Sequence, residues 1–330
     1  MDMIARSLRI VLPGGSGQVG HALARYFQQL GHQVTVLTRL PYAAPWQTVH
    51  WNGRELGPWT EYLDGADVCI NLAGRSVNCR YTAANRRAIY ESRIQSTRLL
   101  GTVISQLAAP PRVWMNASAV TIYPRAVDES GLDLSLNENA EVPAESPSSE
   151  PWSQRRGFVA RVARDWEAEF FAADTPRTRK IALRSAVVLS PAPGTVFAIL
   201  SNLVRSGLGG KQGNGRQFVS WIHEADYARA VEFLVAREDL SGPVNLAAPY
   251  PLPNRDYMAA LRWAWDVPNG LPAPRLAIEL GALFLRTEPE LILQSCRAVP
   301  SRLLESGFKF EFPAWPAAAE DLVRLWKSRD

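Results

Sequence analysis

The chain has 330 residues and a formal net charge of +4 at pH 7, with 47% hydrophobic and 21% charged residues. These values are typical of a folded globular protein with one large or two ordinary domains, and they exclude a disordered chain. The basic residues are scattered without a run of five or more, which is not the footprint of a nucleic-acid-binding protein.

The cysteines and the apolar stretches limit the class of protein further. Cys69, Cys79 and Cys296 form an odd, sparse set, so we expect a reducing, cytoplasmic compartment and no disulfide framework. Neither the cysteines nor the four histidines show metal-ligand spacing. The N-terminal apolar stretch is too short for a signal peptide. Residues 276–285 form an apolar run of ten residues that contains Glu279, which predicts a buried helix rather than a membrane span.

In chain order, short apolar runs alternate with amphipathic segments. The apolar runs predict strands at residues 8–12, 33–39, 48–51, 67–74, 112–118 and 180–189. The segments between them predict helices, of which the main ones are 21–31, 82–107 and 155–170. Strands that alternate with helices indicate an α/β fold, here a Rossmann-type doubly wound parallel sheet. The near-continuous apolar character of the strands fits burial on both faces of this sheet.

The alternation is interrupted once and fades after about residue 190. Residues 124–151 carry seven acids and one arginine, and they predict either a mobile solvated loop or a lid at the sheet edge. Later segments predict a helix at 224–236 and a strand at 242–248, followed by mostly helical chain. We therefore expect a Rossmann domain of residues 1–190 plus about 219–248, and a second, smaller and mostly helical lobe of about 191–218 and 249–330.

A glycine-rich stretch directly follows the first strand and directly precedes the first helix. It reads GGSGQVG over residues 14–20 and contains the spacing G-x-x-G-x-x-G. Glycines permit a tight turn and close approach of the backbone to a pyrophosphate, and the helix N-terminus offers unpaired N–H groups and a positive dipole end. The stretch therefore predicts a dinucleotide site. We expect its cofactor contacts from Gly14, Ser16, Gly17, Gln18, Val19 and Gly20.

The ends of the second and fourth strands predict the rest of this cofactor site. An NAD-preferring site typically has a carboxylate at the end of the second strand, where this chain has Thr38 and Arg39. Arg39 can bind a 2′-phosphate through charge-assisted bonds, which favours NADP over NAD, although an ordinary surface arginine is the plain alternative. After the fourth strand, either the backbone approaches the adenosine half of the cofactor or the chain simply turns. This segment comprises Leu72, Ala73 and Gly74.

Several stretches of the chain resemble the extended, epimerase-like form of the short-chain dehydrogenase/reductase superfamily. They read GGSGQVG, NLAG, NASAVTIYP and FVSWIHEADYARAV, in this order along the chain. The stretches ESRIQSTRLL and RDWEAEF, together with residues 251–308, narrow the resemblance. They are similar to an atypical NAD-dependent epimerase/dehydratase-like branch that ends in a domain of unknown function, DUF1731.

This resemblance implies an epimerase or reductase with a nicotinamide dinucleotide in a Rossmann domain. It also implies that Arg93 faces the cofactor phosphates and that Ala117 lines the cofactor site, although Arg93 fits a solvated helix face equally well. A homodimer through the helices at 82–107 and 153–172 is a further implication.

The superfamily's chemistry implies a serine or threonine at the end of the fifth strand and a Tyr-x-x-x-Lys pair on the next helix. The tyrosine moves a proton at the substrate, and the lysine lowers the tyrosine pKa. The next helix here is 155–170, and the chain has no tyrosine between Tyr123 and Tyr227 and no lysine before Lys180. The pair is therefore absent. A positive charge could instead come from Arg156, Arg161 or Arg164.

Candidate catalytic and substrate-binding residues lie outside that helix. Ser118 can polarise a substrate oxygen and Tyr123 can move the proton, although a serine in a turn and a packed tyrosine are the plain alternative. Lys211 and Arg216 lie in a glycine-rich loop and can meet an acidic or nucleotide-linked substrate, unless that loop is merely solvated. His223 can touch the substrate or be a packed histidine.

Two functions fit these observations. The first is an NADP-dependent oxidoreductase or epimerase that acts on a small carbonyl or sugar-nucleotide substrate with a non-standard acid/base. The second is a catalytically silent NADP(H)-binding sensor or scaffold. The glycine motif fits both functions. The missing tyrosine and lysine favour the second, but we favour the first, because branches of the superfamily replace catalytic groups and the fold alone does not determine function. We expect no metal, no nucleic acid and no membrane as a partner.

Overall fold

The computed structural model describes residues 6–124, 127, 131, 133–142, 157–284 and 288–329. Its centre is a seven-stranded sheet in the order β10-β6-β5-β4-β1-β2-β3, in which every neighbouring pair is parallel. The strands are β1 (Arg9–Pro13), β2 (Gln33–Thr38), β3 (Gln47–His50), β4 (Val68–Asn71), β5 (Val113–Ala119), β6 (Arg179–Ser185) and β10 (Gly242–Leu246). This confirms the predicted doubly wound parallel sheet.

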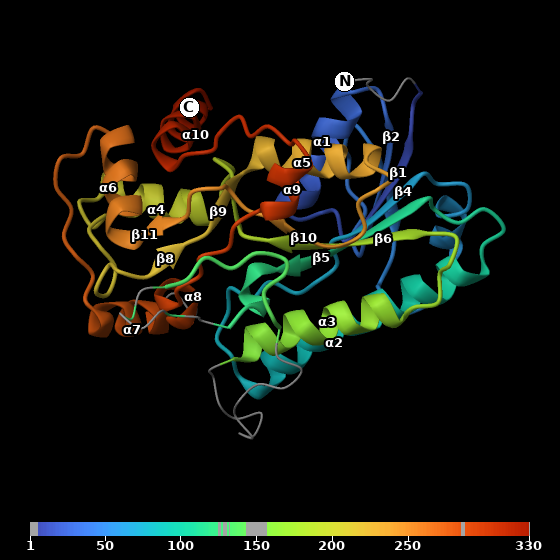
Figure 1. Cartoon of the computed structure of the whole chain (residues 1–330), viewed down its shortest axis with the longest axis horizontal. Helices are drawn as coiled ribbons and strands as arrows, with labels where there is room; N and C mark the ends of the chain where they lie inside the picture. Colours follow the sequence, from blue (N-terminus) through green and yellow to red (C-terminus); the bar gives the residue numbers. More distant parts are fainter. Residues whose placement is uncertain are drawn as a thin grey trace.

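Helices cover both faces of this sheet (Figure 1). One face carries α1 (Gln18–Gln29) and α5 (Glu224–Ala236), and the other carries α2 (Ala83–Gln106) and α3 (Phe158–Ala172). Two short 3-10 helices, η1 (Pro58–Tyr62) and η2 (Val120–Ile122), follow β3 and β5. Because parallel strands must be buried on both sides, each helix layer supplies an apolar stripe that packs on the sheet.

The two faces of the sheet hold separate hydrophobic cores. On the first, Phe27 of α1 and Leu234 of α5 pack in one buried cluster with Met115 of β5. On the second, Trp114 of β5 packs edge-on against Phe170 of α3, with ring centroids 4.7 Å apart. Adjacent strand residues therefore serve opposite cores, which fixes the register of β5 between the two helix layers.

A smaller part of the chain lies beside the sheet and is mostly helical (Figure 1). It contains two short sheets, in which β7 (Val187–Leu189) pairs with β9 (Trp221–His223) and β8 (Phe218–Val219) pairs with β11 (Leu252–Pro253). Its helices are α4 (Val196–Arg205), α6 (Asn254–Ala264), α7 (Arg275–Phe284), α8 (Glu290–Leu293) and α10 (Trp315–Lys327). The short helix α9 (Ser301–Glu305) instead lies beside α5 and β10, and its Leu303 is part of the core of the main sheet (Figure 1). None of the described helices combines the length and the apolar character that a membrane crossing requires.

The predicted strand at 180–189 is two strands that belong to different sheets. β6 runs in the main sheet to Ser185, and the N–H of Ala186 still donates to the carbonyl of Leu246 at 3.0 Å. The next N–H, that of Val187, instead donates to Ser220, and β7 then pairs with β9. The apolar pattern is continuous across the break, because β7 consists of apolar residues even though Val187 is exposed, so the pattern could not reveal the change of sheet.

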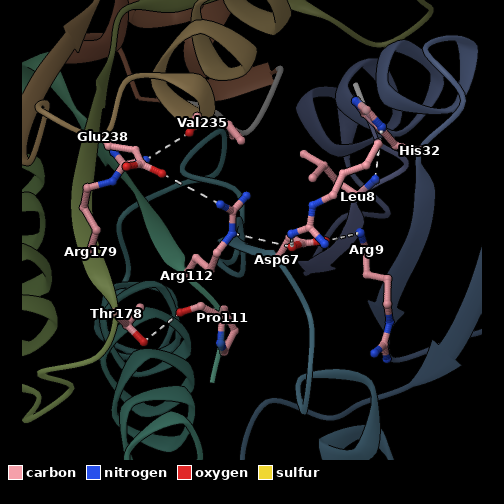
Figure 2. Close-up of polar contacts among 11 residues, drawn as sticks. Leu8, Arg9, His32, Asp67, Pro111, Arg112, Thr178, Arg179, Val235 and Glu238 are labelled. Atoms are coloured by element: carbon pink, nitrogen blue, oxygen red, sulfur yellow. Dashed lines mark hydrogen bonds and ion pairs between the residues drawn. The ribbon is translucent and has the colours of Figure 1, made fainter. Parts of the chain in front are cut away.

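The edge at which the main strands begin is closed by polar contacts (Figure 2). Asp67, directly before β4, accepts a hydrogen bond from the backbone N–H of Arg9 at 2.9 Å. The same carboxylate pairs with Arg6 and with Arg112, the latter at 3.5 Å. Arg112, directly before β5, also faces Glu238 at 3.8 Å. Asp67 and Arg112 therefore have counter-charges within the protein.

Candidate cofactor site

The glycine motif lies at the opposite edge, where the strands end. The N–H of Gly14 donates to the carbonyl of Leu37 in β2 at 2.8 Å, and Gly14 has φ +74°. A Cβ at this position would lie 2.5 Å from the Cα of Ala73. Only glycine combines this left-handed conformation with so close an approach, so the loop is held between the ends of β2 and β4.

The first turn of α1 offers unpaired backbone donors. The helix follows Gly17, which provides no side-chain cap, and its first turn contains no acidic residue. A Cβ at Gly17 would meet no atom within 4 Å, and Ser16 and Gly17 are exposed. The free N–H groups and the positive end of the helix dipole therefore face open space, which suits a phosphate. Of the other predicted contacts, Gln18 donates to the carbonyl of Val188 at 2.9 Å and Val19 packs on the core.

Thr38 is the last residue of β2, next to the glycine loop, and Arg39 directly follows it. Thr38 is buried, and its carbonyl accepts a hydrogen bond from the N–H of Trp51 at 2.8 Å. Arg39 is exposed, and no carboxylate in the described part of the chain lies within ion-pair distance of it. The position at which a ribose-binding carboxylate would be expected therefore presents an uncompensated positive charge.

A buried amide network fixes the turn after β4. The N–H of Ala73 donates to the side-chain oxygen of Asn71 at 3.1 Å. The amide nitrogen of Asn71 in turn donates to Asn116 of β5 at 2.7 Å and to Thr97 of α2 at 3.0 Å. Leu72, Ala73 and Gly74 are left partly or fully exposed beside the glycine loop, as is Ala117 in part.

The same network reaches α3 and supports Arg93. The indole N–H of Trp166 donates to the hydroxyl of Thr97 at 2.7 Å. The guanidinium of Arg93, on α2, lies over the Trp166 ring at 5.0 Å from its centroid. A Cβ at Gly74 would lie 3.0 Å from the Cζ of Arg93, so this charge borders the exposed turn. The structure thus brings the glycine loop, the turn after β4 and Arg93 together.

Ser118 belongs to a second, more deeply buried network. Its hydroxyl donates to Glu167 of α3 at 2.5 Å. Arg184 of β6 donates two bonds to the same carboxylate, at 2.9 Å and 2.8 Å, and both ionic side chains are 7% exposed. Although burial disfavours the charged form of Arg184, the hydrogen bonds and charge of Glu167 raise its pKa. This is a buried, bidentate ion pair.

Tyr123 completes the second network. Its hydroxyl accepts from Arg184 at 3.0 Å and donates to the side-chain oxygen of Asn245 in β10 at 2.8 Å. Burial raises the pKa of Tyr123, although Arg184 and Asn245 act in the opposite direction. The phenol is therefore neutral at physiological pH. The catalytic roles of Ser118 and Tyr123 stay predictions, because both hydroxyls have protein partners here.

The arginines predicted on α3 are engaged elsewhere. Arg161 and Arg164 both face Asp165, at 3.5 Å and 3.8 Å. Arg156 and most of the acidic segment 124–151 lie outside the described residues. The described part of that segment includes Glu138, whose carboxylate accepts from the N–H of Asn245 at 2.9 Å.

In the described residues, no hydrogen bond or ion pair joins the three predicted substrate residues to the glycine loop. Lys211 and Arg216 are exposed in a loop that pairs with residues 271–273, and neither has a carboxylate within ion-pair distance in the described chain. His223 caps α5 by accepting from the N–H of Ala225 at 3.1 Å. It is 2% exposed and stacks on Phe312, so it packs between α5 and the C-terminal segment. Their substrate roles stay predictions.

A cavity of about 410 Å³ lies near the beginnings of β1 and β2, away from this site. Its walls include His32, Trp46 and Tyr62. It contains none of the residues predicted to bind cofactor, and ligands of open parallel sheets bind outside the carboxyl ends of the strands. In the described residues, no group of three or more His, Cys, Asp or Glu side chains could hold a metal ion.

The roles of the buried polar residues in the amide network and in the Glu167–Arg184 network were not predicted from the sequence. Asn71 is the last residue of β4 and Asn116 lies in the middle of β5, so a polar residue within an otherwise apolar strand was the available signal. No comparable signal marked the partners from the helices and β6, because they come from distant parts of the chain. These partners are Thr97, Trp166, Glu167 and Arg184.

The glycine-rich loop at residues 14–20 and nearly all of the sheet lie within the part of the chain that matches a known family. Residues 10–247 match the model of the NAD dependent epimerase/dehydratase family. The chain belongs to this family. Residues 273–322 match a domain of unknown function, DUF1731, as the resemblance implied.

Relatives in this family match nearly the whole chain. An epimerase family protein of Mycobacterium bovis is 32% identical over 303 residues, which are 91% of this chain and 93% of the relative. The structure of human epimerase family protein SDR39U1, solved with NADPH, has a TM-score of 0.81 and 25% identity, with 96% of this chain and 99% of that chain covered. A nucleoside-diphosphate sugar epimerase from Corynebacterium glutamicum has a TM-score of 0.72 and 28% identity, covering 97% of this chain and 59% of that chain. The chain is thus an NAD(P)-binding, epimerase-like protein.

Proposed function

We propose that this protein binds NADP(H) at the carboxyl edge of the sheet and transfers hydride to or from a small carbonyl or sugar-nucleotide substrate. The observation that carries the proposal is the uncapped start of α1 at Gly17, where a Cβ would meet nothing within 4 Å. The backbone there can hold a pyrophosphate without displacing any side chain. When bound, the nicotinamide would supply or accept the hydride.

The preference for NADP over NAD rests on Arg39. An exposed guanidinium without a carboxylate partner suits a 2′-phosphate and offers nothing specific to a free 2′-hydroxyl. The human relative of similar fold was solved with NADPH, which supports the same preference.

The proposal includes a homodimer through α2 and α3, which light scattering on the purified protein would test.

Titration with NADPH and NADH tests this cofactor assignment. We expect Arg39→Ala to weaken NADPH binding roughly tenfold or more and to leave NADH binding nearly unchanged, because a charge-assisted bond is lost only with NADPH. Nicotinamide fluorescence and thermal shift would report both affinities. Arg87→Ala, at a surface arginine paired with Glu91, serves as the control. Equal weakening of both nucleotides, or of neither, would show that Arg39 does not select the cofactor.

The proposed chemistry assigns Ser118 to polarise the substrate oxygen and Tyr123, or a water, to move the proton. Tyr123 is neutral because burial raises its pKa, so it would act as a proton donor. A substrate screen that follows NADPH oxidation would test this, with Tyr123→Phe and Ser118→Ala as variants. Turnover that both variants retain in full would assign the proton transfer to water.

A catalytically silent NADP(H) sensor or scaffold is the second candidate. It is favoured by the hydrogen bonds that already occupy the two candidate groups, from Tyr123 to Asn245 and from Ser118 to Glu167. The same screen separates the candidates. Tight NADPH binding without oxidation by any small carbonyl or sugar-nucleotide would support the silent protein.

A further inference from the structure

The cavity of about 410 Å³ near the beginnings of β1 and β2 lies at a step between two neighbouring strands. β2 begins at Gln33, whereas β3 begins only at Gln47, which pairs with Thr35. In the described chain, the first two residues of β2 therefore have no partner in β3, and the cavity is lined by both of them and by Trp46 and Tyr62. Ligand pockets commonly measure about 300–1,000 Å³, so this volume suits a small, single-ring molecule.

The step presents a backbone donor to the cavity. The N–H of Gln33 donates to the carbonyl of Leu8, on the side of β1, at 2.9 Å. Successive N–H groups of a strand point to opposite sides, so the N–H of Val34 points to the side on which β3 has not yet begun. Val34 lines the cavity and is 6% exposed. A buried peptide N–H requires an acceptor, which a molecule in the cavity can supply.

The indole of Trp46 is a second donor in the cavity wall. Its Nε1 is buried without a hydrogen-bond partner in the described residues. The ring packs on the core beside α1 and lies edge-on to His21, with ring centroids 5.7 Å apart. These contacts hold the ring while its N–H stays unsatisfied. A buried donor without an acceptor costs stability, which a ligand that supplies an acceptor would recover.

Two further side chains of the wall carry donors. The hydroxyl of Tyr62 accepts from the amide of Gln47 at 3.0 Å, so its own proton remains to be donated. Nδ1 of His32 accepts from the N–H of Leu8 at 3.3 Å, and burial lowers the pKa of this imidazole. The ring is therefore neutral at physiological pH, with its proton on Nε2. Both residues line the cavity, so its walls offer donors from several directions.

The cavity wall carries a positive charge. Among the described residues that line it, none is an aspartate or a glutamate, and Arg9 is exposed there. Asp67 binds the backbone N–H of Arg9, and Figure 2 shows the Arg9 side chain extending away from that carboxylate. A cation among N–H and O–H donors, flanked by aromatic rings, matches a flat molecule that carries a carboxylate.

We propose that this cavity is a second ligand site, separate from the cofactor site, and that it binds a small planar carboxylate. The carboxylate accepts from Arg9 and from the open N–H donors, and the ring of the ligand packs against Trp46 and Tyr62. None of the residues assigned to the cofactor or to hydride transfer lines this cavity, so the inference does not depend on the proposed function.

Fluorine NMR with 4-fluorobenzoate tests this proposal, because binding broadens and shifts the fluorine signal of the probe. We expect the neutral 4-fluorobenzamide to bind roughly tenfold more weakly, and Arg9→Gln to weaken 4-fluorobenzoate to a similar degree, since each change removes the charge-assisted bond. Gln33→Trp places a ring in the cavity from an exposed position and should abolish binding. Arg87→Gln, at an exposed arginine paired with Glu91, is the control and should bind as the wild type does.

Saturation with NADPH and the variant Arg39→Ala distinguish this site from the cofactor site. We expect neither to change the affinity for 4-fluorobenzoate. Displacement by NADPH, or loss of binding in Arg39→Ala, would place the carboxylate at the cofactor site and overturn the inference.

Three other results would also overturn it. The first is a wild type that does not bind 4-fluorobenzoate, and the second is equal affinity for the benzoate and the benzamide. The third is unchanged binding in both Arg9→Gln and Gln33→Trp. Melting temperatures check the fold of each variant. If Gln33→Trp is destabilised, Arg9→Gln decides, because its side chain is exposed and its backbone N–H still donates to Asp67.

Discussion

The two edges of the parallel sheet use polar groups in opposite ways. At the edge where the strands begin, Asp67 is bonded by the backbone of Arg9 and paired with Arg112, which also faces Glu238 (Figure 2). At the edge where they end, the first turn of α1 is uncapped and Arg39 has no carboxylate partner in the described chain. At the first edge, Asp67 and Arg112 are satisfied by partners within the protein, whereas the second edge leaves Arg39 and the helix start available to a ligand.

The paired polar groups of the first edge serve stability, whereas the open groups of the second are free to serve binding. Donors left open in a folded protein cost stability unless water or a ligand satisfies them, so a fold retains them where they are used. The carboxyl edge is itself divided, because Glu167 and Arg184 form a closed pair beneath the open part. Substitutions of the internally paired groups should therefore change stability, and substitutions at the open donors should change ligand binding.

The largest expected effect comes from breaking that closed pair. Arg184→Met leaves the Glu167 carboxylate buried without its cation, and removal of one partner of a buried pair costs about 3–5 kcal/mol. We expect the free energy of unfolding in urea to fall by this amount. Combining Glu167→Leu with Arg184→Met should recover part of the loss, because no lone charge then remains buried.

Arg98→Met provides the exposed counterpart of this experiment. The Arg98 side chain is 64% exposed in its pair with Glu169, and exposed pairs contribute at most about 1 kcal/mol. Similar losses for Arg184→Met and Arg98→Met would mean that the buried pair does not stabilise the carboxyl edge.

An intermediate effect is expected from Asp67→Asn at the amino edge. The amide can still accept from the N–H of Arg9, but the ion pairs with Arg6 and Arg112 are lost. Both arginines are more than half exposed, so the loss should be about 1 kcal/mol and should shrink at high salt. NADPH affinity should not change, because these groups lie at the other edge.

Gly17→Ala tests the reverse case at the carboxyl edge. The added methyl group meets no protein atom within 4 Å, so the free energy of unfolding should stay nearly constant. NADPH binding should weaken, since the methyl group occupies space that the pyrophosphate needs. If a variant at either edge changed both the free energy of unfolding and the affinity for NADPH, the two edges would not differ in the way described.

The sequence predicted those features whose causes are local. The loop at residues 14–20 was predictable because strand, glycines and helix start are contiguous, and the buried strands were predictable from their apolar runs. The pair of Arg184 with Glu167 and the stack of Arg93 on Trp166 were not. They depend on how β6 and α2 pack against α3, which no pattern within one segment encodes. The absence of Tyr-x-x-x-Lys was visible in the sequence, and the family resemblance implied Arg93 at the site, but nothing in the sequence indicated that Arg93 stacks on Trp166.

The smallest expected effect concerns two buried histidines, one from each side of the comparison. His32 accepts from the N–H of Leu8 near the amino edge (Figure 2). His223 caps α5 by accepting from the N–H of Ala225. Burial lowers the pKa of both below the ordinary 6.5, although nearby carboxylates act in the opposite direction. The unfolded chain then binds protons that the folded protein does not, so stability present above about pH 6.5 is lost as the pH falls.

We expect the melting temperature to drop on acidification, and the drop to be smaller in His223→Asn, whose side chain can still cap the helix. His32→Asn should also reduce the drop in melting temperature, and independently of His223, because the two sites share no partner in the described chain. If the double variant showed the same pH dependence as either single variant, the two sites would be coupled.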